Sequence, residues 1–123
     1  MNIPKEHQRL MPYFILKGAE KFINFTTAVF GAELIARHQQ EGGEGIMHAE
    51  IRIGETVIMF AEATEQWPPQ TGSIFIYVEN ADSTYATALR EGAVSVMEPA
   101  DKGYGRSGGV KDPTGVTWWI TSL

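Results

Sequence analysis

The amino-acid sequence predicts an α+β domain built from two copies of one βαβββ unit. The apolar run Tyr13–Leu16 leads into a helical pattern that closes on Gly31. About 62 residues later, Phe75–Val78 leads into a second helical pattern that closes on Gly92. Each half then finishes with a strand-like run shortly after a turn glycine, which is Gly54 before Thr56 and Gly115 before Thr117. Such a unit buries its apolar faces only by joining its twin, so we expect one larger mixed sheet that curls around a cleft.

The composition is that of a globular domain with no nucleic-acid or membrane partner. Of its 123 residues, 43% are hydrophobic and 20% charged. The net charge of -5 argues against nucleic acid, because phosphate binding depends on Lys and Arg. The absence of cysteine excludes disulfides and thiolate metal ligands. Residues 1–10 lack the apolar core of a signal peptide, so we expect a cytoplasmic protein.

In the first unit, a strand precedes an amphipathic helix. Met11–Leu16 is largely apolar, as in a strand buried on both faces. Gly18–Phe30 then carries apolar residues at helical spacing, and Gly31 follows as a left-handed helix end. Phe25 falls off the apolar stripe, so we expect this helix to be covered on more than one side.

Three further strands complete the first unit. Glu33–Gln39 alternates in polarity and predicts the first of them. The glycine-rich run Glu41–Gly45 predicts a loop. Ile46–Ile53 alternates cleanly, with His48 and Glu50 on one face and Met47 on the other. Gly54-Glu55 then predicts a turn into a hairpin partner over 56–61.

The second unit repeats the order after a proline-containing linker. The predicted domain plan is a tail over 1–10, a first unit over 11–64, a linker over 65–72 and a second unit over 73–123. The elements predicted in the second unit are a strand over 73–78, a helix over 81–91, a strand over 93–98, a strand over 104–111 and a strand over 117–121. Pro99 is expected to stop the third of these elements. Asp112–Gly115 predicts a type I turn.

These features together resemble a known superfamily. The repeated βαβββ order, Phe25 with Phe30-Gly31-Ala32, and Asp112–Gly115 with Trp118-Trp119 behind it are similar to the vicinal oxygen chelate group of glyoxalases, bleomycin-resistance proteins and extradiol dioxygenases. The likeness spans 11–123, and Met47–Gly54 further resembles the PhnB-like branch. It implies a glyoxalase-like fold, a homodimer, and clefts in which the enzymes of the group hold a divalent metal.

The resemblance also identifies where metal ligands would lie. The corresponding positions are Met11, Met59, Ser73 and Trp119. A thioether, a hydroxyl and an indole do not replace the His or Glu that such a cation needs. We therefore expect no metal and no other cofactor, with a divalent metal ion as the alternative.

His48 and Glu50 are the candidates for chemistry, because they share one strand face. Three interpretations stay open: ligands of a displaced metal site, acid–base groups lining the cleft, or a polar pair bonded to Arg52 or a neighbouring strand. His7 in the tail and His38 at a strand end are given no role.

Aromatic and apolar side chains are the candidates for ligand binding. Trp118 and Trp119 are adjacent on a strand and must point to opposite faces, and we expect Trp118 in the core. The predicted ligand-binding residues are Met59, Phe75, Tyr77, Tyr104, Arg106 and Trp119. Our first hypothesis is metal-independent binding of a small molecule in an aromatic-lined cleft of a homodimer. The alternatives are a metal-dependent or acid–base enzyme near His48 and Glu50, and a structural dimer with filled clefts.

Overall fold

The computed structural model describes residues 1–39, 41–42 and 45–123, so the loop predicted over 41–45 lies partly outside it. Its elements are β1 (Tyr13–Leu16), α1 (Ala19–Phe30), β2 (Glu33–Gln39), β3 (Ile46–Ile53), β4 (Thr56–Glu62), β5 (Ser73–Tyr77), α2 (Ala81–Arg90), β6 (Val94–Lys102), β7 (Gly105–Lys111) and β8 (Thr117–Ser122). This is the βαβββ order, twice. Across those described ranges, no helix is both long and apolar enough to cross a membrane.

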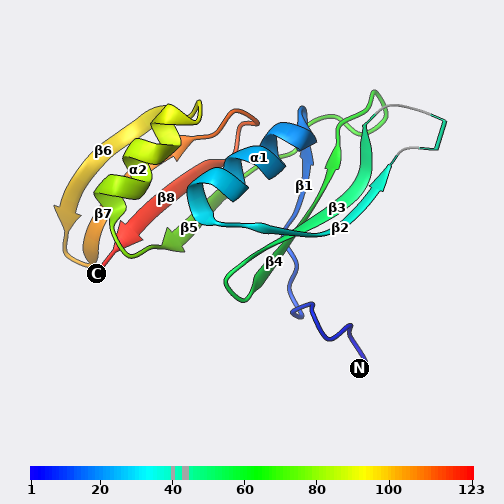
Figure 1. Ribbon diagram of the computed structural model, residues 1–123, viewed down its shortest axis with the longest axis horizontal. Helices are drawn as coiled ribbons and strands as arrows, with labels where there is room; N and C mark the ends of the chain where they lie inside the picture. The colour runs from blue at the N-terminus through cyan, green and yellow to red at the C-terminus, as the bar shows by residue number, and fades with distance from the viewer. Residues whose placement is uncertain (40, 43–44) are drawn as a thin grey trace.

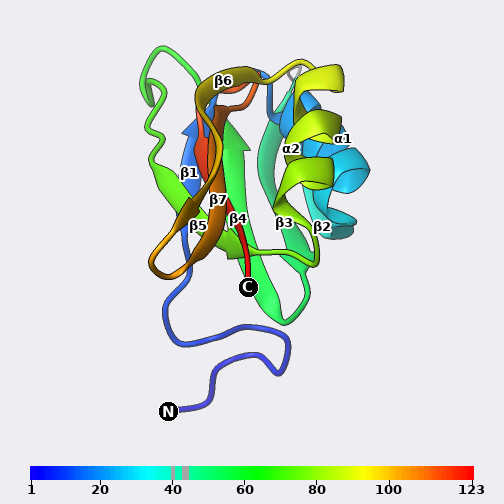
Figure 2. The same cartoon turned by 90° about the vertical axis from the view of Figure 1, so that its left-hand side faces the viewer.

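The two units form separate sheets that lie side by side (Figure 1). Their strand orders are β1-β4-β3-β2 and β5-β8-β7-β6, and the first pair in each is parallel while the others are antiparallel. Both helices cover the same side of the sheets, and the opposite faces carry no helix (Figure 2). The predicted α+β fold is confirmed. The expected single larger sheet is wrong, because side chains rather than strand pairing join the units.

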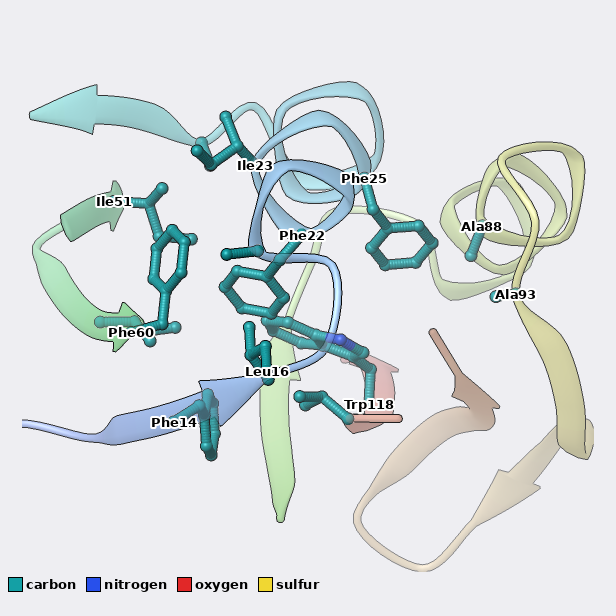
Figure 3. Packing of buried hydrophobic residues seen from close by; sticks show 14 of the residues in the cluster. Phe14, Leu16, Phe22, Ile23, Phe25, Ile51, Phe60, Ala88, Ala93 and Trp118 are labelled. Carbon is teal, nitrogen blue, oxygen red and sulfur yellow. The ribbon is translucent and has the colours of Figure 1, made fainter. Parts of the chain in front are cut away.

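The core that joins them lies between the helices and the sheets (Figure 3). Trp118 of β8 is fully buried, as predicted. Its ring stacks on that of Phe22 in α1, with the centroids 6.2 Å apart, and lies 4.5 Å from that of Phe30. Phe22 in turn meets Phe60 of β4 at 4.9 Å. A helix of the first unit therefore packs on strands of both units, which holds the two sheets in one domain.

Helix α1 begins and ends at glycines. Gly18 has a φ of 93° and Gly31 a φ of 68°, both left-handed, and the helix end at Gly31 is confirmed. The Glu62 carboxylate, at the end of β4, accepts hydrogen bonds from the backbone N–H of Gly18 (3.0 Å) and Ala19 (2.8 Å). An anion at the helix N-terminus accepts hydrogen bonds from otherwise unpaired N–H groups and interacts favourably with the helix dipole. Phe25 is buried on the side of α1 that faces α2, as Figure 3 shows, so the covering of α1 on two sides is confirmed.

The turn before β8 fixes the orientation of both adjacent tryptophans. Asp112 is buried, and its Oδ1 accepts hydrogen bonds from Thr114 and from the Val116 N–H. Its Oδ2 accepts from the Trp118 indole N–H at 2.8 Å. This carboxylate anchors Trp118 among the helices, so Trp119 must point to the helix-free face.

Strand β6 continues through Pro99, contrary to the prediction that the proline stops it. The register of β6 with β7 shifts between Met97 and Ala100, where Pro99 lies. β6 is an edge strand, so a residue without an N–H is tolerated there. Gly108 makes room on β7, since a Cβ at that position would lie 3.1 Å from the Pro99 ring.

Candidate ligand-binding site

The helix-free face of the first sheet carries a row of three paired residues. Tyr13 of β1 pairs with Met59 of β4, which pairs with Glu50 of β3, so their side chains share a face. We call these three residues the polar row. Neighbouring Phe14 and Phe60 point the other way, into the core.

The equivalent row of the second sheet is aromatic. Phe75 of β5 pairs with Trp119 of β8, which pairs with Gly109 of β7, and we call these three the aromatic row. The Trp119 ring lies over Gly109, where a Cβ would come within 2.5 Å of its Cζ3. The Phe75 ring lies 5.3 Å from that of Tyr77 and 6.0 Å from that of Tyr104.

Four of the predicted ligand-binding residues therefore meet on one open face, and two do not. Met59 belongs to the other sheet of the chain. Arg106 and Ser107 are adjacent on β7, so their side chains point to opposite faces of the sheet. Arg106 forms ion pairs with Asp82 (2.7 Å) and Asp101 (3.2 Å). Hydrogen bonds from this guanidinium hold the pKa of Asp82 below its ordinary value. Arg106 lies in a network at the start of α2 rather than beside the rings.

A hydrogen-bonded chain crosses the face of the first sheet. His48 Nε2 lies 2.8 Å from Glu50 Oε2, and His7 Nε2 lies 2.7 Å from Glu50 Oε1. At the other end, the Tyr13 hydroxyl lies 3.4 Å from His48 Nδ1. The His38 ring stacks 6.2 Å from that of His48, so all three histidines of the sequence gather here.

Glu50 is ionised at neutral pH in this setting. Burial alone raises its pKa, but the hydrogen bonds and charges of His48 and His7 together outweigh burial and hold the pKa below its ordinary value. His48 and Glu50 are not bonded to Arg52, which pairs with Glu33 instead. Besides each other, Glu50 contacts His7 and His48 contacts Tyr13.

The sequence analysis gave His7 no role, yet the structure places it in this chain of hydrogen bonds. It reaches Glu50 because its neighbour Gln8 fastens the preceding segment to β4. The Gln8 side-chain amide donates to the Val57 carbonyl at 2.7 Å and accepts from the Val57 N–H at 3.3 Å. No periodicity or motif in residues 1–10 signals this contact, since it joins residues 43 positions apart in the chain.

A groove of about 450 Å³ opens beside the polar row. Its lining residues are Tyr13, Ile15, Met47, Ala61, Glu62, Thr64, Gln66 and Trp67. A register shift between His38 and Gln39 turns Ile46 into the core and leaves Met47 exposed, which corrects the predicted side of Met47. Trp67 is presented by a turn in which its backbone bonds Thr64.

The side chains at the expected metal positions do not fit a divalent cation. Met59 and Trp119 lie in the centre of the two rows, where a thioether and an indole offer no suitable donor. A metal site displaced to the region of His48 and Glu50 does not fit either. Both Glu50 oxygens are already bonded to histidines, and the nearby Glu62 carboxylate caps α1. Among the described residues, no three His, Asp or Glu side chains form a metal-ligand group.

The fold is shared with solved structures of low sequence identity. TioX from Micromonospora sp. ML1 has a TM-score of 0.75 at 21% identity, covering 94% of this chain and 98% of that one. A PhnB protein from Bacillus cereus has a TM-score of 0.77 at 19% identity, with coverages of 94% and 100%. TnmS3, an antibiotic binding protein from Streptomyces sp. CB03234, has a TM-score of 0.70 at 16% identity, with coverages of 94% and 98%. These likenesses establish the fold alone.

A comparison with protein-family models assigns the superfamily. No curated protein matches the sequence significantly. The model described as Glyoxalase/Bleomycin resistance protein/Dioxygenase superfamily matches residues 14–120, which includes both units. With its repeated units and its two open sheet faces, the chain belongs to the glyoxalase/bleomycin resistance protein/dioxygenase superfamily.

Proposed function

We propose that this protein binds a small organic molecule without a metal ion, in the groove beside the polar row. The observation that carries the proposal is the groove itself, whose volume of about 450 Å³ lies within the range of ligand pockets. Its lining combines the rings of Tyr13 and Trp67 with aliphatic side chains and a few polar groups. Such a lining suits a ligand with a flat apolar surface.

We further propose that the working form is a homodimer. Phe75, Tyr77 and Tyr104 are 47%, 64% and 53% exposed, which is unusual for three contacting rings on one face. The aromatic face of one copy, placed against the polar face of another, would cover these rings and enclose the groove. We also assign the chain to the PhnB-like branch, supported by residues 47–54 and by the similarity to the Bacillus cereus PhnB protein.

The descriptions of the family and of one structural neighbour support a binding role. The family description includes bleomycin resistance proteins, and TnmS3 is described as an antibiotic binding protein. By similarity, the proposed ligand is a drug-like or metabolite-like molecule rather than a macromolecule.

Thermal unfolding with a panel of flat aromatic amines and neutral aromatic metabolites tests the binding role. A ligand at about 100 times its Kd raises the free energy of unfolding by about 2.7 kcal/mol. We expect Trp67→Ala to abolish this gain and the control Leu89→Ala, on the outer side of α2, to retain it. Binding that disappears on treatment with a chelator and returns with a divalent metal would refute metal independence.

Sedimentation velocity tests the dimer. We expect a dimer at micromolar concentration, and Phe75→Asp to convert it to a monomer. A monomeric wild-type protein would refute the dimer. A dimer that binds nothing in the panel would favour the third hypothesis, a structural dimer with filled clefts.

A second candidate function, an acid–base enzyme, is favoured by one observation. Tyr13, His48 and Glu50 form a chain in which a carboxylate orients an imidazole that faces a hydroxyl. Such a chain suits proton transfer at a bound substrate. If the protein turns over a bound molecule, we expect His48→Gln to lose turnover while binding remains. Turnover that survives this substitution would exclude the candidate.

A further inference from the structure

The positions of the protons in the His7–Glu50–His48–Tyr13 chain follow from its chemistry. An ionised carboxylate only accepts hydrogen bonds. Because Glu50 is held ionised by its partners, the proton in each of its two short contacts must lie on a histidine. His48 therefore carries a proton on Nε2, and His7 carries one on Nε2.

This assignment determines the role of the tyrosine. A neutral imidazole protonated on Nε2 has a lone pair on Nδ1. Tyr13 is the partner of that atom, at 3.4 Å, so its hydroxyl donates to His48. The proton of Tyr13 is thus directed away from the groove, while the lone pairs of its oxygen remain for a bound molecule.

The charge of the groove favours the same kind of ligand. Tyr13 lines the groove, and among the described residues that line it Glu62 is the one that is charged. Both oxygens of this carboxylate accept hydrogen bonds from the start of α1, but its negative charge at the wall still favours a cation over an anion. The face of a tryptophan suits either a flat ring or a cationic group. Within the part of the lining that the structure describes, there is neither Lys nor Arg to neutralise an anion.

We propose that Tyr13, fixed as a hydrogen-bond acceptor by His48 and Glu50, selects flat aromatic ligands that carry a cationic N–H donor. The inference rests on the proposed binding function and names the ligand chemistry of that same groove. His48 and Glu50 are positioning residues, because they act on the ligand through Tyr13.

Three naphthalene probes of nearly equal size test the selection. Aminomethylnaphthalene carries a cationic donor, acetylnaphthalene carries only an acceptor, and ethylnaphthalene carries neither. In calorimetric titrations at about pH 8, the wild-type protein should bind the amine at least about tenfold more tightly than the other two. Binding of the acetyl probe as tightly as the amine would overturn the inference.

Two variants separate the acceptor from the residues that orient it. Tyr13→Phe should weaken binding of the amine, leaving only the preference that Glu62 and Trp67 give to a cation, and should leave the other probes unchanged. His48→Ala frees the Tyr13 hydroxyl to donate, so the acetyl probe should gain affinity and the preference for the amine should shrink. The matched control is Tyr85→Phe on the helix-covered side, which should keep the wild-type order. An unchanged affinity for the amine in Tyr13→Phe would also overturn the inference.

Nitrogen NMR of the histidine rings tests the proton assignment directly. At the same pH, the His48 signals should show a proton on Nε2 and none on Nδ1. In Glu50→Gln this pattern should be weakened or lost. A proton on Nδ1 in the wild-type protein would overturn the inference whatever the affinities are.

The outcomes also distinguish this inference from the function on which it rests. Equal affinity for all three probes, lost in Trp67→Ala, would leave groove binding intact and refute the role of Tyr13. Failure of every probe to bind would refute both. Binding that is insensitive to Trp67→Ala would place the ligand elsewhere and refute both for this groove.

Discussion

The two open sheet faces have the same geometry and opposite chemistry. In the first sheet, Tyr13, Met59 and Glu50 pair across three strands, and in the second sheet Phe75, Trp119 and Gly109 occupy the equivalent places. Around the first row the neighbours are histidines, and around the second they are tyrosines. The strand orders and pairings are otherwise the same.

The difference teaches which side of each sheet determines the fold. On the helix-covered side both units are apolar, with Phe60 in one and Trp118 in the other packed on Phe22. On the open side, one row holds a bonded carboxylate and the other a ring resting on a glycine. The duplicated architecture therefore constrains the helix side and leaves the open side able to diverge.

The largest expected effect separates the two sides within β8. Trp118→Ala should lower the free energy of unfolding by about 4 kcal/mol, because the ring is fully buried and its N–H pairs with a buried carboxylate. Trp119→Ala should cost clearly less, since Trp119 is only partly buried. Urea unfolding monitored by circular dichroism measures both. Equal losses would show that the open face is packed as tightly as the core.

A smaller effect is expected from the glycine of the aromatic row. Gly109→Ala should cost about 1–3 kcal/mol, since the new methyl would force the Trp119 ring to move. Gly103→Ala is the matched control, because a Cβ there meets nothing within 4 Å. The control should be neutral or slightly stabilising in the same urea assay. A neutral Gly109→Ala would mean that the ring does not rest on this glycine.

The polar row should respond to pH where the aromatic row does not. The folded-state pKa of Glu50 lies below its ordinary value near 4.5. Its ionised form therefore stabilises the fold above that value, and the contribution is lost as the pH falls through the folded-state pKa. Relative to Glu50→Gln, the wild-type protein should be more stable at neutral pH, by about 1–2 kcal/mol for the charged hydrogen bonds. Urea unfolding at a series of pH values should show this difference shrinking in acid, and a difference that does not change with pH would contradict it.

The smallest effect is expected outside both rows. Arg106→Ala should leave the unfolding midpoint unchanged within error, because its ion pairs with Asp82 and Asp101 are exposed and screened. It should also leave ligand affinity unchanged, because the Arg106 side chain on β7 points to Asp82 at the start of α2 and not into the groove. A loss of affinity in this variant would restore the sequence-based prediction that Arg106 contacts the ligand.

Local patterns predicted most of the fold. The alternation along β8 placed Trp118 and Trp119 on opposite faces, and Gly31 marked the end of α1, because each depends on near neighbours in the chain. The prediction at Pro99 failed because edge position is a property of the sheet, which no window of sequence contains. The single larger sheet failed for a similar reason: Phe22 joins the units through packing that depends on the third dimension.

The candidate site was predictable only in part. His48 and Glu50 share a strand face, and alternation alone revealed it. The contacts that complete the hydrogen-bonded chain come from His7 and Tyr13, which are 43 and 35 positions away from their partners. Trp67 of the groove lies in the linker, where no periodic pattern exists to predict the direction of a side chain. Side-chain contacts between distant segments are therefore the part that the sequence alone did not reveal.

The amide of Gln8 has a consequence for association with other chains. Beyond the first residue of β1, the edge of β4 would offer the N–H and carbonyl of Val57 to any extended peptide, and Gln8 occupies both. A side chain thus imitates one peptide unit of a missing strand. Substitution of Gln8 by an aliphatic residue would leave both groups of Val57 without this partner, so a single polar side chain covers the part of the β4 edge that β1 does not reach.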